Sequence, residues 1–210
     1  MKFRPNLSLG SRLRSVFQLY YAPILQFKPI VASYIYKKFK PTVVLDFSAG
    51  WGDRLLAAMV NNIDYIGIDT NKELKKPYKE MIKFFKPHTK SKVIMKFKKA
   101  EKVDYTKLTY DFVLTSPPYY DKESYHHMPK YKNYEDWVEK FLLFTIKKVF
   151  ASLKKNGYCG LHLPKVLYDE VVKLLGKCDE KILYPKQRKN SGYHTDRKAN
   201  YLEYIYFWKK

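Results

Sequence analysis

A serine, two prolines and a tyrosine form the stretch of this chain with the most chemical potential. Ser116-Pro117-Pro118-Tyr119 directly follows a short apolar run, 112–114. The two prolines fix two φ angles and remove two N–H donors, which makes the loop stiff. Ser116 and the Pro117 carbonyl can accept the hydrogens of a planar amine, and the ring of Tyr119 can stack on the ring that carries it. An isolated Pro-Pro pair would indicate only a turn, so the interpretation depends on its neighbours.

Two further polar features follow apolar runs earlier in the chain. The first is Asp46-Phe-Ser-Ala-Gly50-Trp-Gly52, and the second is Asp69, whose carboxylate can bind two ribose hydroxyls. Leu55 stands where a dinucleotide fingerprint needs its third glycine, and Asp53-Arg54 stands where a phosphate-binding P-loop needs lysine. Carboxylates at 46 and 53 would repel phosphates. The loop therefore favours a cationic nucleoside without phosphate, such as S-adenosylmethionine.

Alternating apolar runs and helical patterns predict the elements that position these residues. Five runs predict buried parallel strands, at 42–47, 65–68, 93–97, 112–114 and 158–163. Helical patterns lie at 54–60, 73–85 and 166–175, and another begins after Asn133, a predicted N-cap. Two closing strands, 181–184 and 201–208, should be antiparallel at an edge. The pattern predicts a doubly wound, mostly parallel α/β sheet, in which ligands bind at the carboxyl ends of the strands.

The helix after Asn133 contains three large aromatic residues at helical spacing. Trp137, Phe141 and Phe144 fall on one face of an ideal α-helix, which predicts that all three belong to the core. Pro77, near the start of the predicted helix at 73–85, is a complication for that helix.

The composition favours a nucleic-acid partner and an intracellular location. There are 41 basic and 20 acidic residues, a net charge of +21, and such an excess attracts polyanions. An A+T-rich genome would also enrich lysine, so part of the charge can reflect codon usage. No run of about eighteen apolar residues predicts a membrane span, and no apolar segment after the basic N-terminus predicts a secretion signal. Cys159 and Cys178, without metal-ligand spacing, are expected to be inert thiols.

Together, the motifs resemble those of class I S-adenosylmethionine-dependent methyltransferases, and specifically of the DNA amino-methyltransferases that modify adenine N6 or cytosine N4. Asp46 to Gly52 resembles their motif I, Asp69 their acidic motif II, and Ser116 to Tyr119 their motif IV. The turn and strand at 153–161 are similar to those that follow motif IV, and 26–30 is similar to motif X, which closes over the methionine end of the cofactor. The resemblance implies the Rossmann-like fold of that family.

The resemblance also implies roles for individual residues. The cofactor would be bound by motifs I, II and X and by an acidic residue that receives the adenine amino group. That residue is Glu101, with Asp104 as a competitor. The predicted cofactor-binding residues are Phe27, Pro29, Asp46, Phe47, Ser48, Ala49, Gly50, Gly52, Asp69 and Glu101. Transfer would need Ser116, Pro117, Pro118 and Tyr119, with no metal and no general base, and the target base would leave its stack. Apart from the resemblance, the basic segment 186–200 is either a loop that contacts the nucleic-acid backbone or an ordinary solvated hairpin; nucleic acid would contact Tyr120, Arg188, Arg197 and Lys198. A substrate loop at 120–134 and a basic arm near the N-terminus are further expectations.

The resemblance is incomplete outside the core, and several alternatives stay open. We expect one methyltransferase domain over 1–210, with a basic arm and motif X-like helix at 1–40, a catalytic core at 41–210 and no separate target-recognition domain. Specificity would then come from short loops, a homodimer or partner subunit, or substrate shape. Serine at 116 resembles cytosine-N4 enzymes, although such forms cross between specificities. DNA is favoured; RNA base methylation or a catalytically silent nucleic-acid-binding subunit are the alternatives. Asp46 as a loop cap, Asp69 as an N-cap and Glu101 as a solvated charge are the structural alternatives.

Overall fold

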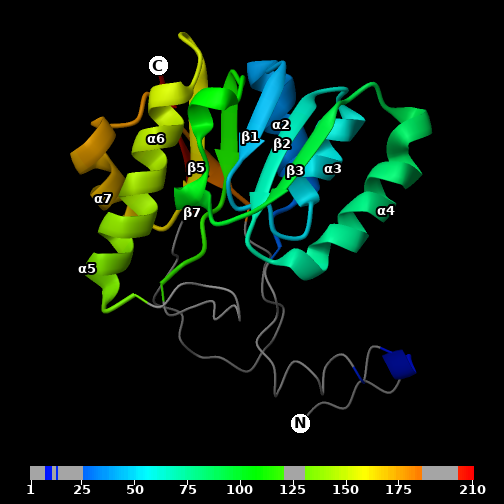
Figure 1. Ribbon diagram of the computed structural model, residues 1–210, viewed down its shortest axis with the longest axis horizontal. Helices are drawn as coiled ribbons and strands as arrows, with labels where there is room; N and C mark the ends of the chain where they lie inside the picture. Colours follow the sequence, from blue (N-terminus) through cyan, green and yellow to red (C-terminus); the bar gives the residue numbers. More distant parts are fainter. Residues whose placement is uncertain (1–7, 11–12, 14–25, 121–130, 186–202) are drawn as a thin grey trace.

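A seven-stranded sheet forms the centre of the molecule (Figure 1). The computed structural model describes residues 8–10, 13, 26–120, 131–185 and 203–210. The strand order is β3-β2-β1-β4-β5-β7-β6; β7 runs antiparallel to both of its neighbours, and the other pairs are parallel. The predicted doubly wound sheet is confirmed. The strands are β1 (Val43–Asp46), β2 (Asp64–Asp69), β3 (Val93–Phe97), β4 (Phe112–Thr115), β5 (Tyr158–Leu163), β6 (Glu180–Tyr184) and β7 (Glu203–Lys209).

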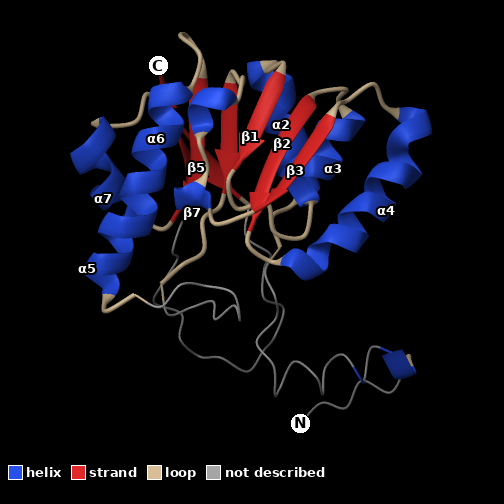
Figure 2. Cartoon of the chain, in the orientation of Figure 1, coloured by secondary structure: helices blue, strands red, loops and turns tan. Residues whose placement is uncertain are grey.

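Helices cover both faces of the sheet, so the molecule has three layers (Figure 2). On one face, the core is closed by α2 (Pro29–Phe39), α3 (Asp53–Val60) and α4 (Lys75–Phe85). The other face packs against α5 (Tyr134–Trp137), a π-helical segment (Val138–Leu143), α6 (Phe144–Ser152) and α7 (Lys165–Leu175). Four 3₁₀ turns complete the described structure: Lys72–Leu74, Lys86–His88, Ala100–Lys102 and Tyr105–Lys107. None of the described helices is long and apolar enough to cross a membrane.

The helix starts follow from local sequence. Asn133 is an N-cap as predicted, because its side chain accepts a hydrogen bond from the backbone N–H of Asp136 at 2.9 Å. The single helix predicted from 73 is instead a 3₁₀ turn followed by α4 from Lys75. Pro77 is thereby placed in the first turn of α4, where its missing N–H has no intrahelical partner to lose.

The predicted aromatic face after Asn133 is wrong at its last member. Trp137 and Phe141 are buried, but Phe144 is 48% exposed. The segment between them is π-helical, and a π turn holds more residues than an α turn, so each side chain advances by a smaller angle around the axis. The face that continues the core along α6 is therefore formed by Ile146 and Val149, both fully buried.

Candidate active site

The sequence-predicted motifs meet at the carboxyl edge of the parallel strands. The loop after β1 lies against β2, because Ala49 N–H donates to the Ile68 carbonyl at 3.0 Å. β1 also pairs with β4, with Leu45 opposite Val113, which brings the Ser116 loop beside the Asp46 loop. Since strand order reverses between β1 and β4, this edge is where open α/β sheets bind their ligands.

Asp46 is fully buried, and its carboxylate is held by three side chains from different elements. It accepts hydrogen bonds from Arg54 Nε at 2.6 Å, from the Tyr65 hydroxyl at 2.6 Å and from the Thr115 hydroxyl at 2.8 Å. Arg54 Nη2 donates to the same carboxylate at 3.3 Å, and Ser48 N–H does so at 3.2 Å. These hydrogen bonds connect β1 with α3, β2 and β4. Asp46 therefore fixes the position of the loop at 46–52 relative to the Ser116 loop.

Arg54 neutralises Asp46 inside the protein. Burial works against the charge of its guanidinium, but the carboxylate of Asp46 and the hydroxyls of Tyr65 and Tyr36 together raise the pKa of Arg54. The same guanidinium donates to the Ser48 carbonyl at 2.5 Å. Because its charge is matched, Asp46 does not provide the phosphate repulsion that we expected from the sequence, and its direct contribution is to the shape of the loop.

The two glycines of the loop differ in what surrounds them. Both have positive φ, +58° at Gly50 and +91° at Gly52. A Cβ on Gly52 would lie 2.8 Å from the Met81 methyl carbon, so the missing side chain there serves packing against α4. At Gly50 the nearest atom within 4 Å of such a Cβ would be the Ser48 carbonyl oxygen, at 3.9 Å. Gly50 is therefore the position where a ligand can approach the backbone.

Asp69 binds the backbone of the loop at 46–52, and both of its carboxylate oxygens can still accept a further hydrogen bond. Its Oδ2 accepts from Gly50 N–H and its Oδ1 from Asn71 N–H, both at 2.8 Å. Burial raises the pKa of Asp69. Each oxygen has a further lone pair, and a pair of vicinal hydroxyls matches two such acceptors. The N-cap of the following 3₁₀ turn is Asn71, which accepts from Glu73 N–H, so capping is not the role of Asp69.

Beyond β3, the two candidate acidic residues have different partners. Asp104 accepts hydrogen bonds from Thr106 through both the backbone N–H and the hydroxyl, and it caps the turn Tyr105–Lys107. Glu101 lies in the preceding turn, where its backbone carbonyl accepts from Lys148 Nζ at 3.0 Å. Since Asp104 is engaged locally, Glu101 is the better candidate for an incoming amino group.

The Ser-Pro-Pro-Tyr loop begins where β4 ends. Pro117 is buried, and Ser116, Pro118 and Tyr119 are half-buried. Tyr120, predicted to contact nucleic acid, is half-buried, and its ring lies 5.8 Å from that of Tyr134 and 6.0 Å from that of Trp137.

A histidine that sequence reasoning missed lies beside Ser116. The Ser116 hydroxyl is 3.2 Å from Nδ1 of His162, which is buried near the end of β5. Thr115 pairs with Leu161 in the parallel register of β4 and β5, which places the next residues of the two strands side by side. The available signal was a lone histidine in an otherwise apolar strand, Tyr-Cys-Gly-Leu-His-Leu.

The motif X-like segment packs against this same region. The ring of Phe27 is buried, 5.7 Å from the His162 ring, and Arg54 lies over it at 5.0 Å. Pro29 is the first residue of α2, where its fixed φ suits the start of a helix. The remaining predicted contacts, Arg188, Arg197 and Lys198, lie outside the described residues, as do 121–130 of the predicted substrate loop and most of the basic arm.

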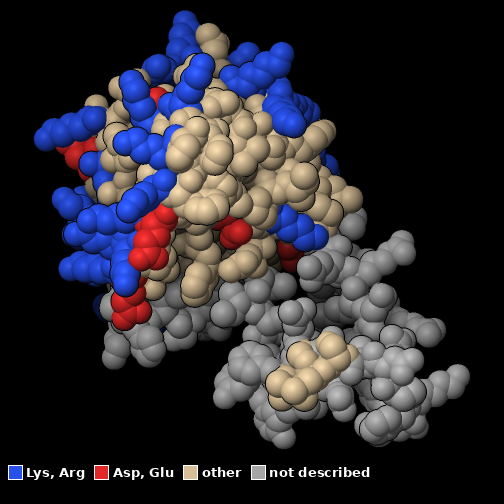
Figure 3. Space-filling view, turned by 90° about the vertical axis from the view of Figure 1, so that its right-hand side faces the viewer, with Lys and Arg blue, Asp and Glu red and all other residues tan. Residues whose placement is uncertain are grey.

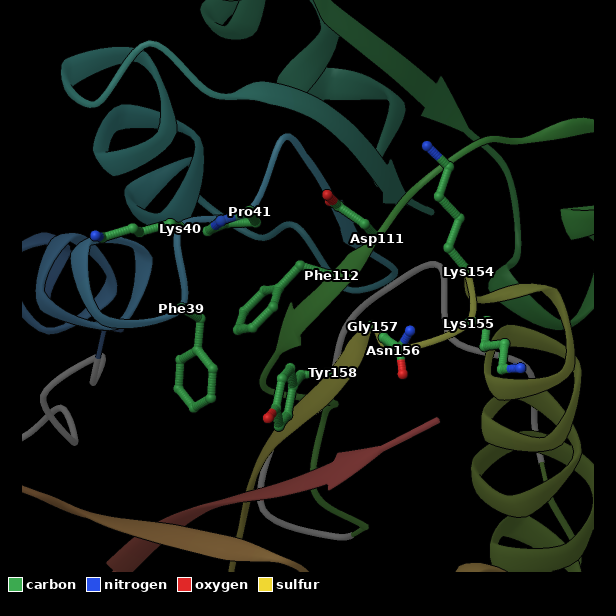
Figure 4. A pocket seen from close by; sticks show the side chains of 10 residues that line it. All are labelled: Phe39, Lys40, Pro41, Asp111, Phe112, Lys154, Lys155, Asn156, Gly157 and Tyr158. Carbon is green, nitrogen blue, oxygen red and sulfur yellow. The ribbon is translucent and has the colours of Figure 1, made fainter.

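A cavity of about 300 Å³ lies at the opposite edge of the sheet (Figure 4). It is formed where the amino ends of β4 and β5 meet the end of α2, and its lining includes Lys40, Lys154 and Lys155. Asp111 also lines it, and its carboxylate accepts hydrogen bonds from Thr42 and Val43. None of the predicted site residues lines this cavity, so we do not assign the chemistry to it.

The chain was compared with protein families, with curated proteins and with solved structures. No protein-family model matches it, and neither does any curated protein sequence. Solved structures do match. An rRNA methylase from Streptococcus thermophilus is 12% identical with a TM-score of 0.54, and the alignment covers 90% of this chain and 99% of that one.

Two further matches have the same character. A SAM-dependent O-methyltransferase from Thermotoga maritima is 14% identical, with a TM-score of 0.56 and coverage of 93% and 69%. A tRNA m1G37 methyltransferase from M. jannaschii is 20% identical, with a TM-score of 0.54, and the alignment covers 86% of this chain but 48% of that one. At these identities the likeness concerns the fold: this chain has the Rossmann-like fold of S-adenosylmethionine-dependent methyltransferases.

The residues present fit that cofactor. The open backbone at Gly50 lies directly beside the two acceptor oxygens of Asp69, because Gly50 N–H is bonded to one of them. A nucleoside without phosphate that carries two ribose hydroxyls suits this pair of features, since it needs close backbone approach and hydroxyl acceptors.

Proposed function

We propose that the protein is an S-adenosylmethionine-dependent methyltransferase that acts on an exocyclic amino nitrogen of a nucleobase. The observation that carries the proposal is the bridge from Asp46 to Thr115, at 2.8 Å. It couples the loop suited to the cofactor with the loop suited to a planar amine. Such coupling is needed when two reactants must be held in line.

The cofactor would be held by the open backbone at Gly50, by Asp69 and by Glu101, with Phe27 and Pro29 at the side of the site. When bound, S-adenosylmethionine supplies a methyl group already activated by its sulfonium. The chain has then to orient the amine. Ser116 Oγ and the Pro117 carbonyl accept its two hydrogens, which directs the nitrogen lone pair away from them, and Tyr119 stacks on the base. The N–C bond would form as the bond between the methyl carbon and sulfur breaks, S-adenosylhomocysteine would leave as a neutral thioether, and the amine would release one proton to water.

Surface charge supports a polyanionic substrate. Lys and Arg side chains gather along the upper and left parts of the face seen in Figure 3, while the centre of that face is largely uncharged. With a net charge of +21, nucleic acid would be attracted over a long range at low salt. The target base would leave its stack, or already be single-stranded, to reach Tyr119.

DNA is our first candidate substrate, at cytosine N4 or adenine N6, because Ser-Pro-Pro-Tyr resembles the motif of DNA amino-methyltransferases. RNA is the second candidate. The observation in its favour is that structures with this fold include proteins described as an rRNA methylase and a tRNA methyltransferase.

Variants of the amine-binding loop test the proposal. Pro118→Ala and Tyr119→Ala should reduce transfer of labelled methyl groups to nucleic acid by at least roughly a hundredfold, because orientation is the main contribution of the protein. Calorimetric affinity for S-adenosylmethionine should stay within about threefold of the wild type, a change below about 1 kcal/mol. Lys76→Ala, on the exposed side of α4, is the control and should change neither. Loss of cofactor affinity in the loop variants would mean that the motif is mainly structural.

A further inference from the structure

Ser116 is paired with His162, a buried residue that has no stated role in the proposed chemistry. The Ser116 hydroxyl and His162 Nδ1 are 3.2 Å apart, and the His162 residue is 7% exposed. On the other side of the ring, Nε2 is buried and lies 3.5 Å from Oε2 of Glu203, at the start of β7. Tyr184 packs on the ring at 4.3 Å.

A serine hydroxyl has one hydrogen and two lone pairs, and that hydrogen decides how the serine treats an amine. If it points toward the amine nitrogen, it binds the lone pair that must attack. If it is donated elsewhere, the lone pairs of Oγ accept a hydrogen from the amine and leave the nitrogen lone pair free. The imidazole of His162 is the group in place to receive it.

We propose that His162 is a positioning residue that fixes Ser116 as a hydrogen-bond acceptor, an inference that rests on the proposed function. In this arrangement neutral His162 has its hydrogen on Nε2, directed to the side of Glu203, and its Nδ1 lone pair accepts the Ser116 hydroxyl hydrogen. The two partners lie on adjacent strands, β4 and β5, so the geometry is set by the sheet.

Nuclear magnetic resonance of the cofactor-free protein tests the pairing without any activity. In protein with ¹⁵N-labelled histidine at pH 8, the His162 ring, assigned by its absence in His162→Asn, should be the tautomer with hydrogen on Nε2. Ser116→Ala should shift the Nδ1 resonance. A ring with its hydrogen on Nδ1, or no change in Ser116→Ala, would overturn the proposal, whether or not the protein is later shown to transfer methyl groups.

Kinetics test the consequence. His162→Phe, which keeps the ring volume, should lower kcat roughly ten- to a hundredfold, the value of one buried hydrogen bond, with KM for nucleic acid and calorimetric cofactor affinity nearly unchanged. His162→Asn offers a carbonyl oxygen near the Nδ1 position that can accept the Ser116 hydrogen, so it should regain most of the rate. His88→Asn, at an exposed histidine, is the control and should keep the wild-type rate. An unchanged kcat in His162→Phe, or a kcat in His162→Asn as low as that in His162→Phe, would refute the role. Were either His162 variant to be unfolded, the resonances of the wild type and of Ser116→Ala would still decide.

Discussion

Removal of the buried cation beside Asp46 should be among the most damaging single changes to this fold. Asp46 is 0% exposed, and Arg54 is the only positively charged residue among the described side chains that donate to its carboxylate. Arg54→Met would leave that buried carboxylate without a positive partner from this set. Methionine keeps much of the stem volume, so the main loss is electrostatic. Breaking a buried pair costs about 3–5 kcal/mol of unfolding free energy, and the remaining donors, Tyr65 and Thr115, should keep the cost toward the lower end.

Urea denaturation followed by circular dichroism measures that cost, and an exposed pair provides the matched control. Lys76→Met breaks the ion pair with Glu80, whose partners are 86% and 66% exposed and 3.9 Å apart. Its cost should be below about 1 kcal/mol.

A double variant separates pairing from packing. Asp46→Asn combined with Arg54→Met should lose less than the sum of the two single changes, because neither buried charge is then left alone. Equal costs for Arg54→Met and Lys76→Met, or strict additivity in the double variant, would refute the role of Asp46 and Arg54 as the hub of the site.

Three further outcomes follow from the geometry of the site and the core. Gly52→Ala should lower the unfolding free energy by about 1–2 kcal/mol, because strain at positive φ is added to displacement of the flexible Met81 side chain, as urea denaturation would measure. Gly50→Ala should cost about 1 kcal/mol and also weaken cofactor binding, which calorimetry would measure. Burial raises the pKa of Asp69 above its value in the unfolded chain, so the folded state binds a proton more readily and gains stability as pH falls. The difference in unfolding free energy between the wild type and Asp69→Asn should therefore shift in favour of the wild type from pH 7 to about pH 4, as urea denaturation would measure. Burial raises the pKa of the Cys159 thiol to about 12, so a thiol reagent should modify the half-buried Cys178 and spare Cys159 in the folded protein, as mass spectrometry would count.

Most of the fold could be predicted because each parallel strand is a continuous apolar run. The run at 93–97 and the run at 158–163 are strands with the predicted bounds, the glycine loop and Ser116 follow strands as expected, and Asp69 is the last residue of β2. The antiparallel placement of 201–208 was also predictable, although the described strand begins at Glu203. Hydrophobic runs signal burial on both faces of a sheet, so they locate strands well.

What could not be predicted depends on contacts between distant residues. Arg54 reads as an ordinary charged residue in the first turn of a helix, and only the fold brings it into contact with Asp46. His162 reads as one polar residue in a strand until the register of β4 and β5 sets it beside Ser116. Phe144 fits an ideal helical face, and it is exposed because the preceding π-helical turn rotates it away.

The two loop glycines show the same limit at finer scale. Both are required by positive φ, which sequence alone can suggest from a glycine-rich turn. Only packing separates them, because the space at Gly52 is filled by α4 and the space at Gly50 is open. The sequence could therefore suggest that both glycines have positive φ, whereas the different surroundings of the two could not be predicted.

Mass spectrometry of nucleosides after methyl transfer tests the central claim most directly. The wild-type protein would be incubated with S-adenosylmethionine carrying a deuterated methyl group and, separately, with DNA and RNA, each in single-stranded and duplex form at low salt. We expect a deuterated methyl group on an exocyclic amino nitrogen, as N4-methylcytosine or N6-methyladenine, and its loss in Tyr119→Ala. A protein that binds the cofactor but labels neither nucleic acid, or that labels only a ring carbon or a ribose oxygen, would contradict the assignment of Ser116 to Tyr119 as an amine-binding loop.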